Sequence, residues 1–158
     1  LYNTTRIMKT IAIYPGSFNK MHIGHINILE KAERIFGRGN VLIAVGVNPD
    51  KLSTPKSDED LHLLEQRINR KIITYNKFLH ELIQDYEDDG YKVVIIRGLR
   101  NGVDLDYEVN QYRFVDDFKK DVNVIYLTCD REYEHISSSA IRKIEQFGGP
   151  DMTKQYLV

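Results

Sequence analysis

Short runs rich in β-branched residues alternate along this chain with longer segments whose apolar residues recur at helical spacing. This alternation is typical of β-α-β units, in which helices cover both faces of a parallel sheet. The expected strands are residues 10–14, 41–47, 71–75, 93–97 and 123–128, and the run at 71–75 is the weakest. We therefore predict an α/β fold, with a single Rossmann-like, doubly wound domain around a five-stranded parallel sheet.

Helical periodicity fills the intervals between the expected strands. Residues 24–36 predict a first helix that ends at Gly37, and Ser57 with Asp60 forms an acidic variant of a capping box before a second. In a fold of this type, ligands bind beyond the carboxyl ends of the strands. Three further helices are expected at about 78–86, at 105–118 and after the serine run at 137–139.

Length and charge exclude several classes of function. The 158 residues carry 22 Lys and Arg against 23 Asp and Glu, for a net charge of −1, whereas a general nucleic-acid coat needs clustered basic charge. The longest apolar run, at 41–47, is far shorter than the roughly 20 residues of a membrane span. Cys129 has no second cysteine to pair with, and no signal-peptide pattern opens the chain. We expect a cytoplasmic protein without nucleic-acid or membrane partners, with residues 1–7 as a flexible leader or tag and 8–158 as one domain.

The loop after the first expected strand has the composition of an anion site. It reads Tyr14-Pro15-Gly16-Ser17-Phe18, and His22-Ile23-Gly24-His25 follows at the start of the first helix. A helix N-terminus carries unpaired N–H groups and the positive end of a dipole, so the two histidines and these amides can face one anion. A turn with two surface histidines, or a histidine pair for a metal, is the alternative interpretation.

A second candidate loop, Arg97-Gly98-Leu99-Arg100, lies where the fourth expected strand ends, at the same carboxyl edge of the sheet. Two arginines around a glycine offer forked donors to phosphate oxygens. The alternative is that they pair with Asp104, Asp106 or Glu108 as a surface network. Glu108 could instead accept hydrogen bonds from a ribose.

The third candidate is the segment 132–142, whose serines 137–139 begin a helix. Serine hydroxyls and free amides at a helix start can hold phosphate oxygens, although plain N-capping is the simpler interpretation. Lys51, after the second strand, adds a mobile positive charge to the same edge, or is an ordinary loop lysine. Three such loops at one sheet edge favour a nucleotide site.

The motifs His22-Ile23-Gly24-His25 and Ile136-Ser137-Ser138-Ser139-Ala140-Ile141-Arg142 resemble those of the nucleotidylyltransferase superfamily. Within it, the chain is similar to the phosphopantetheine adenylyltransferase family in three segments. These are the first loop, the Arg97–Arg100 segment with Asp104 and Tyr107-Glu108, and Glu132-Tyr133 before the serines. The resemblance runs in order from about residue 8 to residue 149.

The resemblance implies adenylyl transfer from ATP to 4′-phosphopantetheine, giving dephospho-coenzyme A and pyrophosphate, with Mg²⁺ carried by the ATP phosphates and no metal ligands in the protein. It implies that the family's homohexamer forms and that three residues act in catalysis: His25, Lys51 and Arg100. Contacts to the acceptor are implied for Ser17, Lys51, Ile83 and Arg97. Contacts to ATP are implied for Ser17, Phe18, His25, Gly98, Leu99, Arg100, Glu108, Tyr133, Glu134, His135, Ile136, Ser137, Ser138 and Ser139.

The chain also departs from the family pattern. Asn19-Lys20 replaces a usual Asp-Pro, His22 a usual Thr, and Asn110 a usual Gln, and the family's final helix is expected to be shortened. Adenylyl transfer to nicotinamide mononucleotide is therefore an alternative, because that branch shares the histidine and serine motifs. A non-catalytic nucleotide or coenzyme A sensor is another, suggested by the altered segment 19–21.

Overall fold

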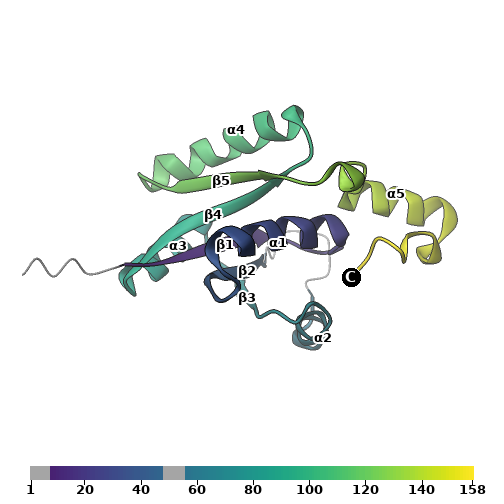
Figure 1. Ribbon diagram of the computed structural model, residues 1–158, viewed down its shortest axis with the longest axis horizontal. Coiled ribbons are helices and arrows are strands. Elements are labelled where there is room, and N and C mark those ends of the chain that lie inside the picture. The colour runs from purple at the N-terminus through teal and green to yellow at the C-terminus, as the bar shows by residue number, and fades with distance from the viewer. Residues whose placement is uncertain (1–7, 48–55) are drawn as a thin grey trace, which may run out of the picture.

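Five strands form one parallel sheet in the computed structural model, which describes residues 8–47 and 56–158. They are β1 (Lys9–Gly16), β2 (Val41–Gly46), β3 (Ile72–Tyr75), β4 (Tyr91–Leu99) and β5 (Asn123–Thr128). Their order is β3-β2-β1-β4-β5, so the chain reverses its direction of travel across the sheet between β1 and β4 (Figure 1). The predicted α/β fold with a five-stranded parallel sheet is confirmed, including the weakest strand.

Five α-helices connect and flank the strands, namely α1 (Ile23–Phe36), α2 (Asp58–Ile68), α3 (Leu79–Asp88), α4 (Gly102–Phe118) and α5 (Ser138–Gly148). The capping box predicted at α2 forms, since the Ser57 hydroxyl accepts from the Asp60 N–H at 3.1 Å and the Asp60 carboxylate accepts from the Ser57 N–H at 3.2 Å. Single-turn 3₁₀ helices lie at Arg38–Asn40, Arg131–Tyr133 and Pro150–Thr153.

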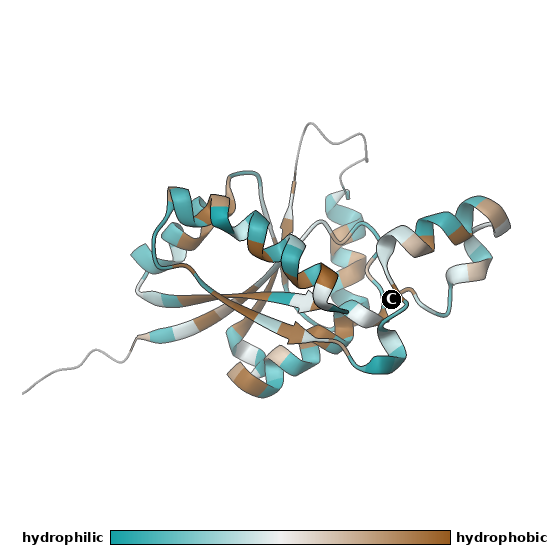
Figure 2. Ribbon diagram, turned by 90° about the horizontal axis from the view of Figure 1, so that it is seen from above, coloured by the Kyte–Doolittle hydropathy of each residue, from teal (hydrophilic) through white to brown (hydrophobic). Residues whose placement is uncertain are grey.

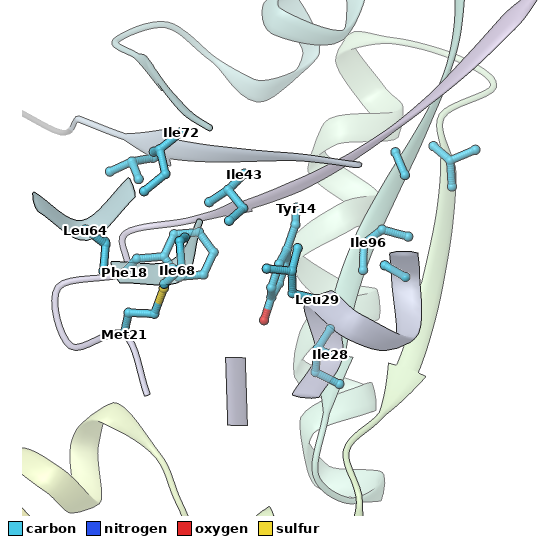
Figure 3. Close-up of a cluster of buried hydrophobic side chains, with 14 residues drawn as sticks. Tyr14, Phe18, Met21, Ile28, Leu29, Ile43, Leu64, Ile68, Ile72 and Ile96 are labelled. Carbon is cyan, nitrogen blue, oxygen red and sulfur yellow. The ribbon is translucent and has the colours of Figure 1, made fainter. Parts of the chain in front are cut away.

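The core lies on both faces of the sheet. Leu29 of α1 and Leu64 of α2 pack on one face, where Phe18 and Met21 of the first loop join them (Figure 3). On the other face, Ile83 of α3 packs against β1 and β4. Figure 2 shows that hydrophobic residues concentrate on the strands and on the helix sides turned toward them, as a doubly covered parallel sheet requires. None of the helices in the described ranges combines the length and apolarity of a membrane span.

Strand β4 extends further than the sequence predicts. Its pairing with β5 continues through Arg97 opposite Tyr126 to Leu99 opposite Thr128, so Arg97 and Gly98 lie within a strand and not on a loop. The sequence predicts a strand that ends at Arg97, followed by a loop, because the apolar pattern stops there. The ladder with β5 fixes the backbone there and gives Arg97 a rigid support.

The segment after α5 returns to the start of α1. The Tyr156 carbonyl accepts from the Ile23 N–H at 2.9 Å, the Met21 carbonyl accepts from the Val158 N–H at 3.2 Å, and His22 pairs with Leu157 in an antiparallel bridge. Figure 1 shows this segment and α5 together beyond the carboxyl end of the sheet. Residues 156–158 thus pack against residues 21–23.

Candidate active site

Two cavities open at the carboxyl ends of the strands and share a wall formed by Pro15, Gly16, Ser17 and Arg97. The first has a volume of about 340 Å³ and the second about 840 Å³. Both lie where β1 and β4 separate the two halves of the sheet, which is the position that the strand order predicts for a ligand.

The first cavity unites the three segments that the sequence singled out. It is lined by the first loop and the histidine motif, by the end of β4, and by the start of α5. The predicted residues found on its wall are Ser17, Phe18, His25, Arg97, Gly98, Leu99, Arg100, Tyr133, Ile136, Ser137, Ser138 and Ser139. Tyr14 of the first candidate loop also lines this cavity, and so do Ile28 and Cys129, which were not among the predicted site residues; their places on the first helix and after the last strand were the available signal.

Phe18 holds the first loop in an unusual backbone conformation. Its φ is +47°, a left-handed value that costs a non-glycine residue roughly 1–2 kcal/mol. The ring is buried and meets the rings of Tyr14 and His25 edge to face, with centroids 5.2 and 5.1 Å away. Phe18 is therefore part of the core and of the wall of the first cavity at once.

His22 and His25 form a reciprocal cap at the start of α1. The Gly24 N–H donates to His22 Nδ1 and the His22 N–H donates to His25 Nδ1, both at 3.1 Å, and the rings stack with centroids 3.8 Å apart. An Nδ1 that accepts leaves the ring proton of the neutral form on Nε2. Each imidazole is therefore a neutral N–H donor.

The two rings stay neutral well below physiological pH. Burial, followed by the neighbouring His22 and Arg97, lowers the pKa of His25 to about 3, and burial with Arg100 lowers the pKa of His22 to about 4. A charged phosphate at the site would oppose this shift. The two imidazole donors at this helix end are therefore neutral.

We expect these two pKa values to make folding stability depend on pH. Because the unfolded histidines titrate near 6.5 and the folded ones near 3 and 4, the unfolded state binds more protons between these values, and stability falls as pH drops through that window. The loss is at most about 1.4 kcal/mol per pH unit for each ring. Urea unfolding at pH 7.0 and 5.5 should show a smaller loss for His25→Asn than for the unsubstituted protein. Equal losses would contradict the expectation.

The start of α1 differs from the prediction of unpaired amides. The Ile23 N–H binds the Tyr156 carbonyl, the Gly24 N–H binds the His22 ring, and the His25 N–H binds the His22 carbonyl at 2.9 Å. Local sequence pattern does not indicate the returning C-terminal segment, which supplies the first of these acceptors. We therefore expect an anion in this corner to meet the imidazole Nε2–H groups.

Each arginine of the β4 segment is held by a carboxylate of α4. Arg97 donates from Nε and Nη2 to the two oxygens of Glu108 at 2.8 and 2.7 Å, and from Nη1 to the Pro15 carbonyl at 2.7 Å. Arg100 donates to Asp104 from Nε at 3.0 Å and from Nη2 at 3.1 Å. The pairing weighed as an alternative to phosphate binding does form, yet both arginines also line the first cavity.

Gly98 lets α1 approach β4 closely. A Cβ at this position would lie 2.8 Å from Cγ1 of Ile28, a buried side chain of α1. The glycine is therefore required by helix–strand packing, in addition to any access it gives to the cavity.

The second cavity was not foreseen as a whole. Its wall combines the shared residues with the ends of β2 and β3 and one side of α4, including Tyr75, Lys77, Tyr107, Gln111 and Tyr112. Tyr112 lies under the Arg97 guanidinium, 6.0 Å from ring centroid to Cζ. The sequence feature that could have indicated this cavity is the helical spacing of Tyr107, Glu108 and Gln111, which places them on one side of one helix.

Some residues implied by the resemblance lie elsewhere. Glu108 lines the second cavity and not the first, and Ile83 is 1% exposed in the core without reaching either wall. Glu134 and His135 are exposed and also outside the lining of the first cavity. Lys51 lies outside the described residues. The contacts of these residues with ligands remain predictions.

A buried amide ties the third segment to α1. Asn27 and Asp130 exchange hydrogen bonds, with the Asn27 side chain donating to Asp130 Oδ2 at 2.9 Å and the Asp130 N–H donating to Asn27 Oδ1 at 2.8 Å. Lys31 adds an ion pair to Asp130 at 2.8 Å. The loop that precedes the serines is thereby fixed two residues from His25.

The chain is similar to known proteins in sequence and in fold. The cytidylyltransferase-like family matches residues 13–144. A phosphopantetheine adenylyltransferase of Geotalea daltonii is 31% identical over 140 residues, which cover 89% of this chain and 86% of the relative. One of Clostridium novyi is 30% identical over 139 residues, covering 88% and 85%. The crystal structure of a lipopolysaccharide core biosynthesis protein from Thermoplasma volcanium shares the fold, with a TM-score of 0.51, 16% identity and coverage of 77% of this chain and 98% of that one.

The site and fold define a nucleotidyltransferase. The chain belongs to the cytidylyltransferase-like family and, within it, to the phosphopantetheine adenylyltransferases.

Proposed function

We propose that this protein transfers the adenylyl group of ATP to 4′-phosphopantetheine in the cytoplasm, giving dephospho-coenzyme A and pyrophosphate. The observation that carries the proposal is the meeting of two cavities at Ser17 and Arg97. One cavity has the donors that a triphosphate needs, and the other is larger and borders the same arginine. The names of the similar proteins support this choice of acceptor.

The second cavity has the chemistry of a long, amide-containing arm that ends in a phosphate. Tyr75, Gln111 and Tyr112 give it hydroxyl and amide groups among apolar ring surfaces, while Arg97 lies at its junction with the first cavity. A pantetheine arm carries two amides and a hydroxyl on an apolar chain. We infer that the arm occupies this cavity with its phosphate beside Arg97.

The chemistry then requires positioning more than proton transfer. An oxygen of the acceptor phosphate attacks the α-phosphorus of ATP, a new P–O bond forms, and the bond to the β-phosphate oxygen breaks to release pyrophosphate. The attacking phosphate is already anionic, so no general base is needed. His25 Nε2–H donates to the α-phosphate oxygens, and Lys51 is proposed to bind the same oxygens. Arg100 and serines 137–139 bind the leaving pyrophosphate.

We propose that Mg²⁺ enters with ATP. Within residues 8–47 and 56–158, no group of three or more His, Cys, Asp or Glu side chains is placed to hold a metal ion. The donors on the wall of the first cavity suit phosphate oxygens, and Mg²⁺ commonly keeps most of its contacts to phosphates and water. The ion would neutralise charge on the triphosphate.

A pyrophosphate-release assay tests the acceptor. The protein is incubated with ATP and Mg²⁺ and with phosphopantetheine, nicotinamide mononucleotide or no acceptor. We expect release with phosphopantetheine alone. Nicotinamide mononucleotide is the second candidate because Phe78, Tyr107 and Tyr112 line the second cavity and could stack a pyridine ring.

The other outcomes select between the remaining functions. Release with nicotinamide mononucleotide alone would replace the proposed acceptor. No release with any acceptor, together with ATP binding by calorimetry, would show a nucleotide sensor and overturn the enzymatic proposal.

We also propose that the protein forms the homohexamer that the resemblance implies. One side of α4 exposes Val103, Tyr107, Phe114 and Phe118, each at least 64% exposed. An apolar strip of this kind on a soluble domain favours association, and a second copy would cover it. Sedimentation equilibrium would count the subunits, and a monomer at micromolar concentration would contradict this part of the proposal.

A further inference from the structure

The face of α4 toward β4 carries two carboxylates one helical turn apart, each opposite one arginine of the β4 segment. Asp104 holds Arg100 and Glu108 holds Arg97, in both cases through two side-chain nitrogens. The Asp104 carboxylate also accepts from the Arg100 N–H at 2.9 Å. In each pair, one carboxylate of α4 binds two nitrogens of one arginine. Arg100 of the first pair lines the first cavity, and Arg97 and Glu108 of the second pair line the second cavity.

Glu108 is the residue of α4 that is buried, with 9% exposure, on a helix whose other residues are mostly open to solvent. Both of its oxygens accept from Arg97. Burial acts to lower the pKa of Arg97, but the hydrogen bonds to Glu108, followed by the nearby Tyr112, the charge of Glu108 and Tyr14, outweigh it and raise that pKa, so the guanidinium is held charged. A carboxylate engaged in this way is poorly placed to bind a nucleotide ribose as well.

Arg97 keeps donor capacity for a ligand. A guanidinium has five N–H groups, and the bonds to Glu108 and Pro15 use three of them. An unsupported arginine loses about 2 kcal/mol of rotamer entropy when it is fixed on a ligand. A carboxylate that fixes the side chain beforehand removes much of that cost, and it also leaves the remaining N–H groups in a set direction.

We propose that Asp104 and Glu108 are positioning residues, which orient Arg100 toward ATP and Arg97 toward the phosphate of the acceptor. This inference rests on the proposed function. It assigns Glu108 to the acceptor side through Arg97, whereas the resemblance implies a direct contact with ATP. The two assignments differ in which substrate loses affinity when Glu108 changes.

The test compares Glu108→Gln, Asp104→Asn and the control Asp106→Asn, which makes the same charge change at an exposed position of α4. For each we would measure kcat, the KM of both substrates, and the Kd of ATP by calorimetry. Glu108→Gln should raise the acceptor KM about tenfold, the effect of losing one charge-assisted hydrogen bond, with the Kd of ATP within twofold of the parent. Asp104→Asn should weaken ATP about tenfold with little effect on the acceptor KM, and Asp106→Asn should change neither.

Each other outcome contradicts the inference. A rise in the Kd of ATP for Glu108→Gln equal to that in the acceptor KM would show a nucleotide contact or a general structural role, and unchanged constants would show no positioning role. Glu108→Asp keeps the charge but shortens the side chain, so it should repeat the acceptor-specific defect if Glu108→Gln fails to fold. Absence of turnover in the unsubstituted protein would count against the proposed function, and the calorimetric comparison of Asp104→Asn with Asp106→Asn would still decide the role of Asp104.

Discussion

His25→Ala should lower kcat by about 10²- to 10³-fold and change the KM for ATP much less. The loss corresponds to roughly 2.7–4 kcal/mol, the usual effect of removing one oriented donor from the site of a developing negative charge. The structure gives the reason for the orientation, because the backbone N–H of His22 fixes the ring through Nδ1 and the proton is left on Nε2. Steady-state pyrophosphate release would measure both constants.

His62→Ala is a suitable control for this experiment. His62 lies on α2 with its side chain 68% exposed, away from both cavities, so its removal should leave kcat unchanged. A kcat for His25→Ala within threefold of the control would remove His25 from the transition state. A large rise in KM at constant kcat would instead assign it to ground-state binding.

Arg97→Met should destabilise the fold by about 3 kcal/mol, besides its effect on the acceptor. The substitution leaves the carboxylate of Glu108 without its partner, and breaking a buried pair costs about 3–5 kcal/mol. We take the lower end because the Arg97 side chain remains 26% exposed against 11% for Glu108. Urea unfolding at pH 7 measures the change.

A second substitution distinguishes the cost of leaving the Glu108 carboxylate unpaired from the cost of lost side-chain packing. Arg97→Met with Glu108→Gln should recover most of the stability, because the uncompensated charge is then absent. Lys154→Met, which breaks an ion pair whose side chains are 75% and 83% exposed, should cost less than about 1 kcal/mol. If the double variant is no more stable than Arg97→Met alone, the cost lies in packing and not in charge.

Sequence periodicity predicted the elements of this fold well because local pattern decides them. The β-branched runs became strands, and the Ser57 and Asp60 signal marked the start of α2, since both depend on neighbours within a few residues. The predicted end of β4 was wrong by two residues, because it is set by pairing with β5, a partner far away in sequence. Local pattern carries no information on such a ladder.

The candidate site also combines features that local sequence pattern predicts with features that depend on distant segments. The motif residues gathered at one cavity because parallel strands end at a common edge, which topology alone predicts. The second cavity, the Asn27–Asp130 bond and the partner of the Ile23 amide depend on contacts between distant segments. For the arginines, the sequence offered phosphate binding and pairing with acids as alternatives, and the structure shows that the pairing leaves them on the cavity wall.

The return of the C-terminal segment to α1 makes ligand binding and local unfolding linked equilibria. When this segment opens, the Ile23 amide loses the Tyr156 carbonyl and becomes an additional donor at the dipole end of α1. A ligand that uses this amide favours the open segment, whereas one that makes no contact with it leaves the equilibrium unchanged. Hydrogen exchange at Ile23, compared with and without ATP, would show whether ATP shifts this equilibrium. A stretch of chain remote in sequence from the histidine motif thus sets how many donors that motif offers.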